Sequence, residues 1–448
     1  MNITFLGAAG TVTGSSYLLT TDNGEKILID MGMFQGNEEI MSINNEPLQF
    51  DPKSIDAVIL THAHIDHNGR LPMLAKHGYK GPIYMTEATQ LLSELTLLDS
   101  AKIAAENATV DPLYSDQDVY ATLNLARIVR YGEQINIGSL KCIFRDAGHI
   151  LGSASIELIN NEKKRIIFSG DLGNSPEDLV RPTELIPEGD VVIMESTYGD
   201  HAHSTEDPNA ILQQEINRVE KNGGALLIPA FSLERSQILL YKIDKLKRDG
   251  LVKMETPVFL DSPMAVRATR IYKDFKELHN VTYLAQEQFD DPLDFPGLEM
   301  IEDVHKSREI KRREGAKVII AGSGMMSGGR ILGHSIEFLP LETTRLLIVG
   351  FQGEGTLGRQ IEEGAKVVTI FDTEVAINAT VRKLSSISAH ADQPKLMSWL
   401  SYIQGVKQVF LTHGEDDSRN ILSEKIKADL DIKNVILPKR GEQIDIQL

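Results

Sequence analysis

Residues 58–67 constrain the fold more than any other part of the chain. They begin with a Val-Ile-Leu run at 58–60, and a short apolar run bounded by polar residues is typical of a buried strand. Residues 61–67 then contain three histidines and an aspartate. Side chains two positions apart leave an extended chain on the same side, so His62 and His64 can share one metal ion.

The second half of this stretch is expected to point in another direction. Asp66 and His67 follow a turn, because Gly69 and Pro72 mark a loop that enters a helix. This second pair therefore suits a second ion near the first. Imidazole and carboxylate groups are ligands of Zn²⁺, Mn²⁺ and Fe²⁺. A polar loop with chance histidines is the alternative, but three of the 12 histidines fall within six positions, which favours a metal site.

The same pattern, an apolar strand that ends in one metal-competent side chain, recurs along the chain. The residues at these strand ends are Asp30, His149, Asp171, Glu195 and His413. Rigid strands that deliver ligands to one sheet edge can build a preorganised site from distant segments. Each of these residues alone is more typical of a strand terminator, whereas five together beside residues 58–67 favour a shared site.

The order of the expected elements indicates an α/β protein with more than one domain, as its 448 residues also predict. Residues 1–204 are strand-rich, and their strands come in groups, which favours two sheets with helices outside, an αββα sandwich. The helical patterns of this part lie near 70–77, 87–106 and 115–130. Residues 386–448 add helices near 393–403 and 416–428 around a strand at 408–411.

Residues 205–385 differ, because strands and helices alternate there. Such alternation predicts βαβ units and hence a parallel sheet in a separate α/β domain. The expected strands lie at 225–228, 257–260, 317–321, 345–349 and 365–370.

Composition excludes several classes of protein. A net charge of −18 argues against broad, non-specific affinity for nucleic acid, although metal cations would supply local positive charge. The single cysteine, Cys142, excludes an intramolecular disulfide and a thiolate metal cluster. No apolar run approaches the roughly 20 residues of a membrane helix, and the N-terminus lacks the basic region of a signal peptide. We therefore expect a cytoplasmic protein with no membrane partner.

Two glycine- or serine-containing strand-to-helix junctions are candidate phosphate sites. In residues 321–330, backbone N–H groups before a helix can hold a phosphate. The residues of this junction that could contact the phosphate are Ser323, Ser327, Gly328 and Arg330. The alternative is a tight turn that needs glycine for its backbone conformation. Ser232, in the junction at 229–236, is a further candidate, whereas the basic run at 306–317 is better interpreted as a solvated helix face.

Residues 62–67 resemble the HxHxDH signature of the metallo-β-lactamase superfamily. The resemblance implies that one metal is held by His62, His64 and His149, and the other by Asp66, His67 and His413. It also implies that Asp171 bridges the two metals. Asp30 resembles the acceptor that orients a metal-bound histidine and determines its tautomer.

Three later motifs narrow the family. Residues 195–199 (ESTYG), 388–392 (SAHAD) and 411–414 (LTHG) resemble motifs A, B and C of the β-CASP nucleases. This group includes the cleavage and polyadenylation endonuclease and its bacterial and archaeal relatives, some of which carry an added RNA-binding domain that we do not see here. In these proteins the β-CASP domain is inserted within the metallo-β-lactamase domain. The resemblance covers the whole chain and implies domains at 1–204, 205–385 and 386–448.

The resemblance predicts a ribonuclease. A histidine in motif C is typical of RNA-associated members, so His413 favours single-stranded RNA as the substrate. We expect two Zn²⁺ ions, with Mn²⁺ or Fe²⁺ as alternatives, and a homodimer. The expected activity is endonucleolytic, with 5′-exonuclease action left open.

Four residues are expected to carry the chemistry. Asp66 or Asp171 would orient the nucleophile, and Glu195 would brace His390 or a ligand histidine. His390 would contact the scissile phosphate or protonate the leaving oxygen, because imidazole titrates near working pH. Two alternatives remain at this point: a small-molecule ester or thioester hydrolase of the same fold, and a non-catalytic scaffold for RNA processing.

Overall fold

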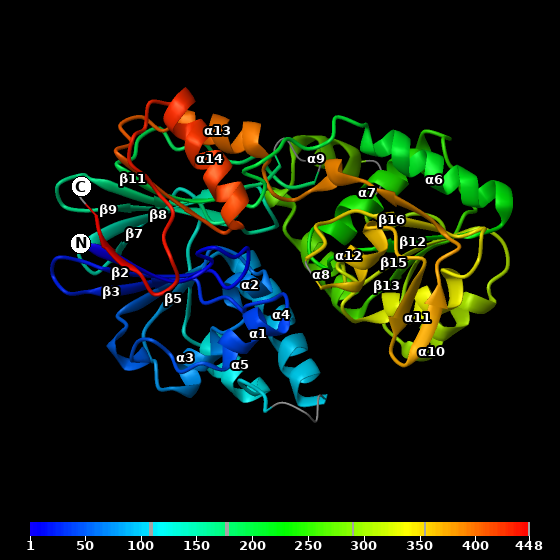
Figure 1. Cartoon of the computed structure of the whole chain (residues 1–448), viewed down its shortest axis with the longest axis horizontal. Helices are drawn as coiled ribbons and strands as arrows, with labels where there is room; N and C mark the ends of the chain where they lie inside the picture. The colour runs from blue at the N-terminus through cyan, green and yellow to red at the C-terminus, as the bar shows by residue number, and fades with distance from the viewer. Residues whose placement is uncertain (107–110, 175–178, 289–290, 354, 447–448) are drawn as a thin grey trace. The chain divides into compact units, whose positions relative to one another are not determined.

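The computed structural model describes residues 1–448 except 107–110, 175–178, 289–290, 354 and 447–448 (Figure 1). The chain divides into two compact units. Unit 1 contains Met1–Ala202 and His390–Leu448, and unit 2 contains His203–Ala389. In the described residues, no helix combines the length and the apolar character needed to cross a membrane.

The described residues of unit 1 form two seven-stranded sheets. The first sheet has the order β22-β1-β2-β3-β4-β5-β6, and the second has the order β21-β20-β11-β10-β9-β8-β7. The strands of the first sheet are β1 (Asn2–Gly7), β2 (Ser16–Thr20), β3 (Lys26–Ile29), β4 (Ala57–Ile59), β5 (Ile83–Met85), β6 (Ala126–Ile128) and β22 (Gln443–Asp445). Those of the second are β7 (Gln134–Ile137), β8 (Leu140–Asp146), β9 (Ala154–Ile159), β10 (Arg165–Phe168), β11 (Val191–Glu195), β20 (Gln408–Thr412) and β21 (Val435–Ile436).

The alternation of side chains along each strand builds the layers of unit 1. In β4, Ala57 and Ile59 pack in the core between the two sheets, whereas Val58 points the other way, into a core under helices. The helices that pack on the first sheet are α2 (Ile65–Asn68), α3 (Pro72–Lys76), α4 (Glu87–Glu106) and α5 (Asp116–Leu123), whereas α1 (Glu38–Ser42) has no buried residue. On the second sheet, Ile167 and Val192 pack with α13 (Gln393–Tyr402) and α14 (Asp416–Asp429). The predicted αββα sandwich is therefore confirmed.

Unit 2 is built on a parallel sheet with the order β14-β13-β15-β12-β16-β19. Its strands are β12 (Ala225–Pro229), β13 (Val258–Asp261), β14 (Leu298–Met300), β15 (Lys317–Ala321), β16 (Arg345–Ile348) and β19 (Thr380–Lys383). Its helices are α6 (Pro208–Asn222), α7 (Arg235–Arg248), α8 (Pro263–Asp274), α9 (Val281–Glu287), α10 (Val304–Glu309), α11 (Arg330–Phe338) and α12 (Leu357–Glu362). The predicted parallel α/β domain is confirmed.

Two local predictions are wrong. The helix predicted over 115–130 ends at Leu123, and Ala126–Ile128 instead pairs with β5 as an edge strand. The backbone bonds from Ile83 N to Leu125 O and from Val129 N to Met85 O show the reason, because pairing with the open edge of β5 overrides local helical preference. The strand predicted at 365–370 does not join the parallel sheet but forms the antiparallel hairpin of β17 (Val367–Ile370) and β18 (Thr373–Ala376).

Candidate metal centre

The candidate metal centre of unit 1 lies where parallel strands of both sheets end. His62 and His64 follow β4, and Asp30 follows the neighbouring β3. His64 begins α2, so Asp66 and His67 lie in the first turn of that helix. Backbone bonds from Ser15 N to Asp66 O and from Met31 N to His67 O hold this turn in place. The other residues arrive on the second sheet, where His149, Asp171 and His413 follow β8, β10 and β20, and Glu195 ends β11.

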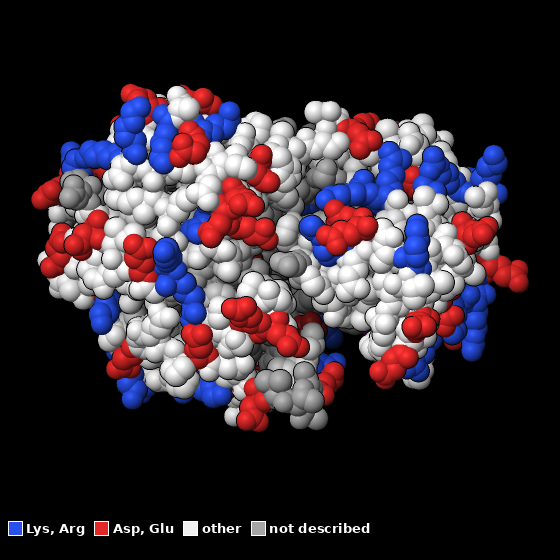
Figure 2. Space-filling model, in the orientation of Figure 1, with Lys and Arg blue, Asp and Glu red and all other residues white. Residues whose placement is uncertain are grey.

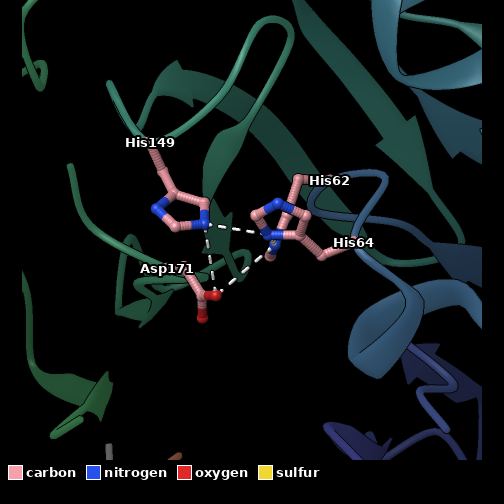
Figure 3. A group of neighbouring side chains, drawn as sticks. All are labelled: His62, His64, His149 and Asp171. Atoms are coloured by element: carbon pink, nitrogen blue, oxygen red, sulfur yellow. Dashed lines mark hydrogen bonds and ion pairs between the residues drawn. The ribbon is translucent and has the colours of Figure 1, made fainter. Parts of the chain in front are cut away.

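One group of converging side chains consists of His62, His64, His149 and Asp171 (Figure 3). One donor atom from each residue lies within 4.8 Å of the others. His64 Nδ1 is 3.2 Å from His62 Nε2 and 3.0 Å from His149 Nε2. Asp171 Oδ2 faces the same point, at 3.4 Å from His62 Nε2 and 3.5 Å from His149 Nε2.

A second group consists of Asp66, His67 and His413. His413 Nε2 lies 3.3 Å from Asp66 Oδ2. The other oxygen of Asp171, Oδ1, lies 3.2 Å from His67 Nε2 and 3.6 Å from His413 Nε2. Asp171 therefore directs one carboxylate oxygen toward each group of histidines.

The unpaired atoms of this cluster fit a divalent metal. Both carboxylate oxygens of Asp171 and the Nε2 atom of His67 are buried, and among the described residues they have no hydrogen-bond partner. Buried polar groups are normally paired, and nitrogen and carboxylate oxygen donors that converge are the usual ligands of a borderline cation.

The charge states of the cluster also fit metal binding. Burial lowers the pKa of His64 to about 3, and it lowers the pKa values of His62 and His149 as well. These three imidazoles are therefore neutral, as metal ligation requires. Burial alone would raise the pKa of Asp171, but nearby histidines, His413 and His67 foremost, hold that pKa well below its usual range, so its carboxylate is ionised.

Hydrogen bonds on the far side of the imidazoles determine which nitrogen faces the centre. Thr61 donates its hydroxyl hydrogen to Asp30 Oδ2 at 2.8 Å, so it can only accept from His62 Nδ1, 3.0 Å away. Thr197 donates to the carbonyl of His413 at 3.1 Å and accepts from His413 Nδ1 at 2.9 Å in the same way. His67 Nδ1 lies 2.7 Å from Asp30 Oδ2. In each case Nε2 is the nitrogen that faces the centre. Burial lowers the pKa of His67, but Asp171 and Asp30 outweigh it and raise this pKa well above its usual range, so metal binding there would displace a proton from Nε2.

Thr61 and Thr197 were not among the residues that the sequence singled out. The signal that could have identified them is chemical, because a buried ligand histidine needs a partner for its second nitrogen. Thr61 directly precedes His62, and Thr197 lies two residues after Glu195. A hydroxyl close in sequence to an expected ligand is therefore the signal of such an orienting partner.

His390 and Glu195 form a pair beside Asp171. His390 Nδ1 lies 3.3 and 3.2 Å from the two oxygens of Glu195, and 3.9 Å from Asp171 Oδ2. Glu195 is buried and also accepts a bond from Leu172 N at 2.6 Å, which ties it to the end of β10. Burial lowers the pKa of His390, but the carboxylates of Glu195 and Asp171 outweigh it and raise this pKa to about 9.

Apart from His390, which belongs to unit 1, the residues predicted to contact phosphate lie in unit 2. Ser232 is buried, with Oγ 3.3 Å from Ser262 Oγ. Ser323 accepts a bond from Ser327 N at 3.0 Å within the turn, and a Cβ added at Gly328 would meet nothing within 4 Å.

The guanidinium of Arg330 is already engaged with other groups. Its Nη1 donates to Asp261 Oδ1 at 2.6 Å and to Ile301 O at 3.1 Å, and its Nη2 donates to Glu302 O. The buried Asp261 also accepts from Ser307 Oγ and lies 2.6 Å from His334 Nε2. Asp261 lies outside every motif that the sequence displayed, so this network could be found only in the fold.

The basic run at 306–317 pairs with acidic side chains. Lys311 lies 2.5 Å from Glu337, and Arg313 lies 3.1 Å from Glu299, with both pairs exposed. On the face shown in Figure 2, lysine and arginine side chains are likewise interspersed with aspartate and glutamate. This arrangement is typical of a solvated surface.

Three family models match successive parts of the chain. The metallo-beta-lactamase superfamily matches residues 9–130, the Beta-Casp domain matches 236–361, and the Zn-dependent metallo-hydrolase RNA specificity domain matches 374–438. A solved structure of a protein of unknown function from Enterococcus faecalis V583 shares the fold, with a TM-score of 0.56 and 13% identity over 99% of both chains.

Three curated relatives extend over nearly the whole chain. Ribonuclease TTHA0252 of Thermus thermophilus is 39% identical, and the alignment covers 100% of this chain and 100% of that protein. Transcription termination factor FttA of Methanosarcina mazei is 32% identical over 97% of this chain and 70% of its own length. RNase aCSPSF2 of Saccharolobus solfataricus is 29% identical over 98% of this chain and 84% of its own. The family predicted from the motifs is confirmed: the protein belongs to the β-CASP branch of the metallo-β-lactamase superfamily.

Proposed function

We propose that the protein is a metal-dependent ribonuclease that hydrolyses phosphodiester bonds of single-stranded RNA. The observation that carries the proposal is the division of Asp171 between two groups of buried donor atoms, with one oxygen facing each. The RNA specificity domain model and the ribonuclease names of two relatives support RNA as the polymer.

The metal ligands follow from the two groups. We assign His62, His64 and His149 to one cation and Asp66, His67 and His413 to the other, with Asp171 shared. Two Zn²⁺ ions are proposed, with Mn²⁺ or Fe²⁺ as alternatives, since imidazole and carboxylate donors suit all three. When bound, such a pair lowers the pKa of a water and stabilises the charge that gathers on a phosphate.

Side chains of the site would also orient the attacking water and donate a proton. Asp66 and Asp171 present carboxylate oxygens that can accept a hydrogen bond from the attacking water and orient it. His390 has the raised pKa of a proton donor, and Glu195 holds its Nδ1. The proton on Nε2 of His390 is then the one available to the scissile phosphate or to the leaving 3′-oxygen.

Unit 2 would hold the RNA backbone. Ser323, Ser327 and Gly328 lie in a turn before α11, where backbone N–H groups and hydroxyls can donate to phosphate oxygens. Ser232 is proposed as a further contact. Arg330 would mainly anchor this turn, because Asp261 and two carbonyls already engage its guanidinium, and it would reach phosphate with its remaining N–H groups.

The wider assignments are also part of the proposal. They are the domain limits 1–204, 205–385 and 386–448, a cytoplasmic location and a homodimer. Light scattering on the purified protein measures the oligomeric state, and a monomer would remove the homodimer from the proposal.

One digestion tests the proposed activity and its mode. A long RNA labelled at either end is incubated with the protein, and its products are sized over time, with DNA of the same sequence as the control. Labelled fragments of intermediate length from both the 5′-labelled and the 3′-labelled RNA indicate endonuclease action. Labelled mononucleotides from the 5′-labelled RNA alone indicate exonuclease action. Equal rates on RNA and DNA would contradict the RNA preference. Turnover of a panel of small esters and thioesters, with RNA left intact, would overturn the proposal itself.

A further inference from the structure

The chain leaves the neighbouring strands β12 and β15 of unit 2 toward opposite edges of the sheet. From β12 the chain passes through α7 to β13, beyond β15, whereas from β15 it passes through α11 to β16, on the far side of β12. Crossovers between parallel strands are right-handed, so α7 and α11 lie on opposite faces of the sheet (Figure 1). Such a switch point leaves a crevice beyond the carboxyl ends of the two strands, which is where open α/β sheets bind ligands.

Phe231 lies at this switch point, two residues after the end of β12. Its ring lies against the backbone of two glycines, Gly324 and Gly350. A Cβ added at Gly324, after β15, would come within 2.6 Å of Phe231 Cδ2, and one at Gly350, after β16, within 3.3 Å of Cε2. Despite this support, Phe231 remains 38% exposed.

A buried amide holds the two glycine segments together. Gln352 Nε2 donates to Gly324 O at 3.0 Å and to Gly350 O at 3.2 Å, and the Gln352 side chain is almost completely buried. Hydrogen bonds therefore hold together the two segments that support the Phe231 ring. A ring on such a support loses little conformational entropy when it stacks on a ligand.

The size of the exposed ring indicates what it can bind. A stable protein–protein interface needs about 800 Å² from each partner, far more than part of one ring. A nucleobase has about the area of a phenylalanine ring, and single-strand-binding proteins use exposed aromatic rings to stack bases beside groups that bind the backbone. The groups proposed above to bind the backbone lie in the chain directly after Gly324, where Ser327 is exposed and Gly328 has open space around it.

We propose that Phe231 is a stacking platform for one nucleobase of the RNA strand, next to the turn at 323–329. The proposal depends on the ribonuclease function above and adds a residue that contacts a base rather than the backbone. Every base has a flat face, so this contact would strengthen RNA binding with little preference for sequence.

The test compares substitutions that separate ring stacking from packing. Phe231→Leu keeps apolar bulk without a flat face, Phe231→Tyr keeps the ring, and Phe371→Ala removes a ring that is 69% exposed on the β17–β18 hairpin of the same unit. KM and kcat for a single-stranded RNA are measured with each, and thermal melting reports on folding. We expect Phe231→Leu to raise KM roughly 5- to 150-fold with kcat nearly unchanged, and the other two variants to match the wild type.

An abasic scan gives a readout that a purely structural role would not change. One abasic nucleotide is moved along the RNA, and at one position it should raise the KM of the wild type by the factor seen for Phe231→Leu, but add nothing in that variant. An unchanged KM for Phe231→Leu, equal abasic effects in both proteins, or a KM change accompanied by an altered oligomeric mass would overturn the proposal. If the wild type cleaves no RNA, the proposed function fails instead, and fluorescence anisotropy with the same RNAs still tests stacking.

Discussion

Replacing Asp30 by asparagine should weaken one metal site more than the other. The buried Asp30 accepts from Thr61 N through Oδ1 and from Thr61 Oγ1 through Oδ2, which also lies 2.7 Å from His67 Nδ1. An asparagine that keeps its oxygen on Thr61 N turns its NH₂ group toward His67 Nδ1. The imidazole must then accept at Nδ1 and carry its proton on Nε2, the atom that faces Asp171.

The size of the effect follows from the role of this contact. Loss of a carboxylate that orients a ligand histidine typically lowers metal affinity about 10- to 100-fold, which is roughly 1.4–2.7 kcal/mol. Asp30 reaches His62 indirectly, through the Thr61 hydroxyl, whose lone pairs can still accept from His62 Nδ1, so the other group should change less. We therefore expect the two binding constants to separate by one to two orders of magnitude in the variant.

The assay is a competition between metal-free protein and a chromophoric chelator for Zn²⁺. Asp56→Asn is the matched control, because Asp56 is exposed at the start of β4 and accepts a bond only from Lys26 N among the described residues. It should leave both constants unchanged. If Asp30→Asn also left both unchanged, or weakened both equally, the assignment of Asp30 to a single ligand would be refuted.

Three further predictions test other parts of the structure. His390→Ala should retain its metal by elemental analysis and lose about 10²- to 10⁴-fold in kcat, and unchanged turnover would remove His390 from the reaction. In metal-free protein the pKa of His390 is raised from 6.5 to about 9 against opposing burial, chiefly by Glu195 and Asp171, so folding binds a proton between these values. The proton on His390 stabilises the folded state by roughly 3 kcal/mol at most, in full below pH 6.5, and this contribution is lost as the pH rises toward 9. Urea unfolding of the wild type and of His390→Gln at pH 6 and pH 9 should show the loss in the wild type alone. The same pH dependence of the unfolding free energy in both proteins would contradict this prediction. Lys247→Met should cost about 1–3 kcal/mol in thermal or urea unfolding, because the buried ammonium donates to three carbonyls, and a neutral result would show that these acceptors find other partners.

Local patterns in the sequence were sufficient for much of the fold. The strand expected at 317–321 has those bounds, because a short apolar run followed by glycine determines a strand within a few residues. Residues 126–128 show the limit of this reasoning. Their strand exists because β5 has an open edge, and the sequence nearby carries no trace of that edge.

In the candidate site, too, some features follow from local sequence patterns and others depend on segments far apart in the chain. Its histidines and aspartates were recognisable because they follow apolar strands, and the family they predict is confirmed, while their individual roles remain predictions. Of the groups that orient them, Asp30 was recognised from the sequence, whereas Thr197 was not. Thr197 and His413 lie 216 residues apart, and the engagement of Arg330 by Asp261 spans 69 residues. Such hydrogen bonds depend on how the strands are ordered in the sheets, which no local pattern contains.

We propose that two metal ions held around Asp171 make the protein a ribonuclease. The rate of RNA cleavage, measured as Zn²⁺ or Mn²⁺ is added back to metal-free protein, tests this most directly. We predict no cleavage without metal and a rate that rises to a plateau at about two equivalents per chain. Asp171→Asn, purified in the same way, should stay inactive at every metal concentration. Cleavage that is independent of metal, or an Asp171→Asn protein as active as the wild type, would contradict the claim.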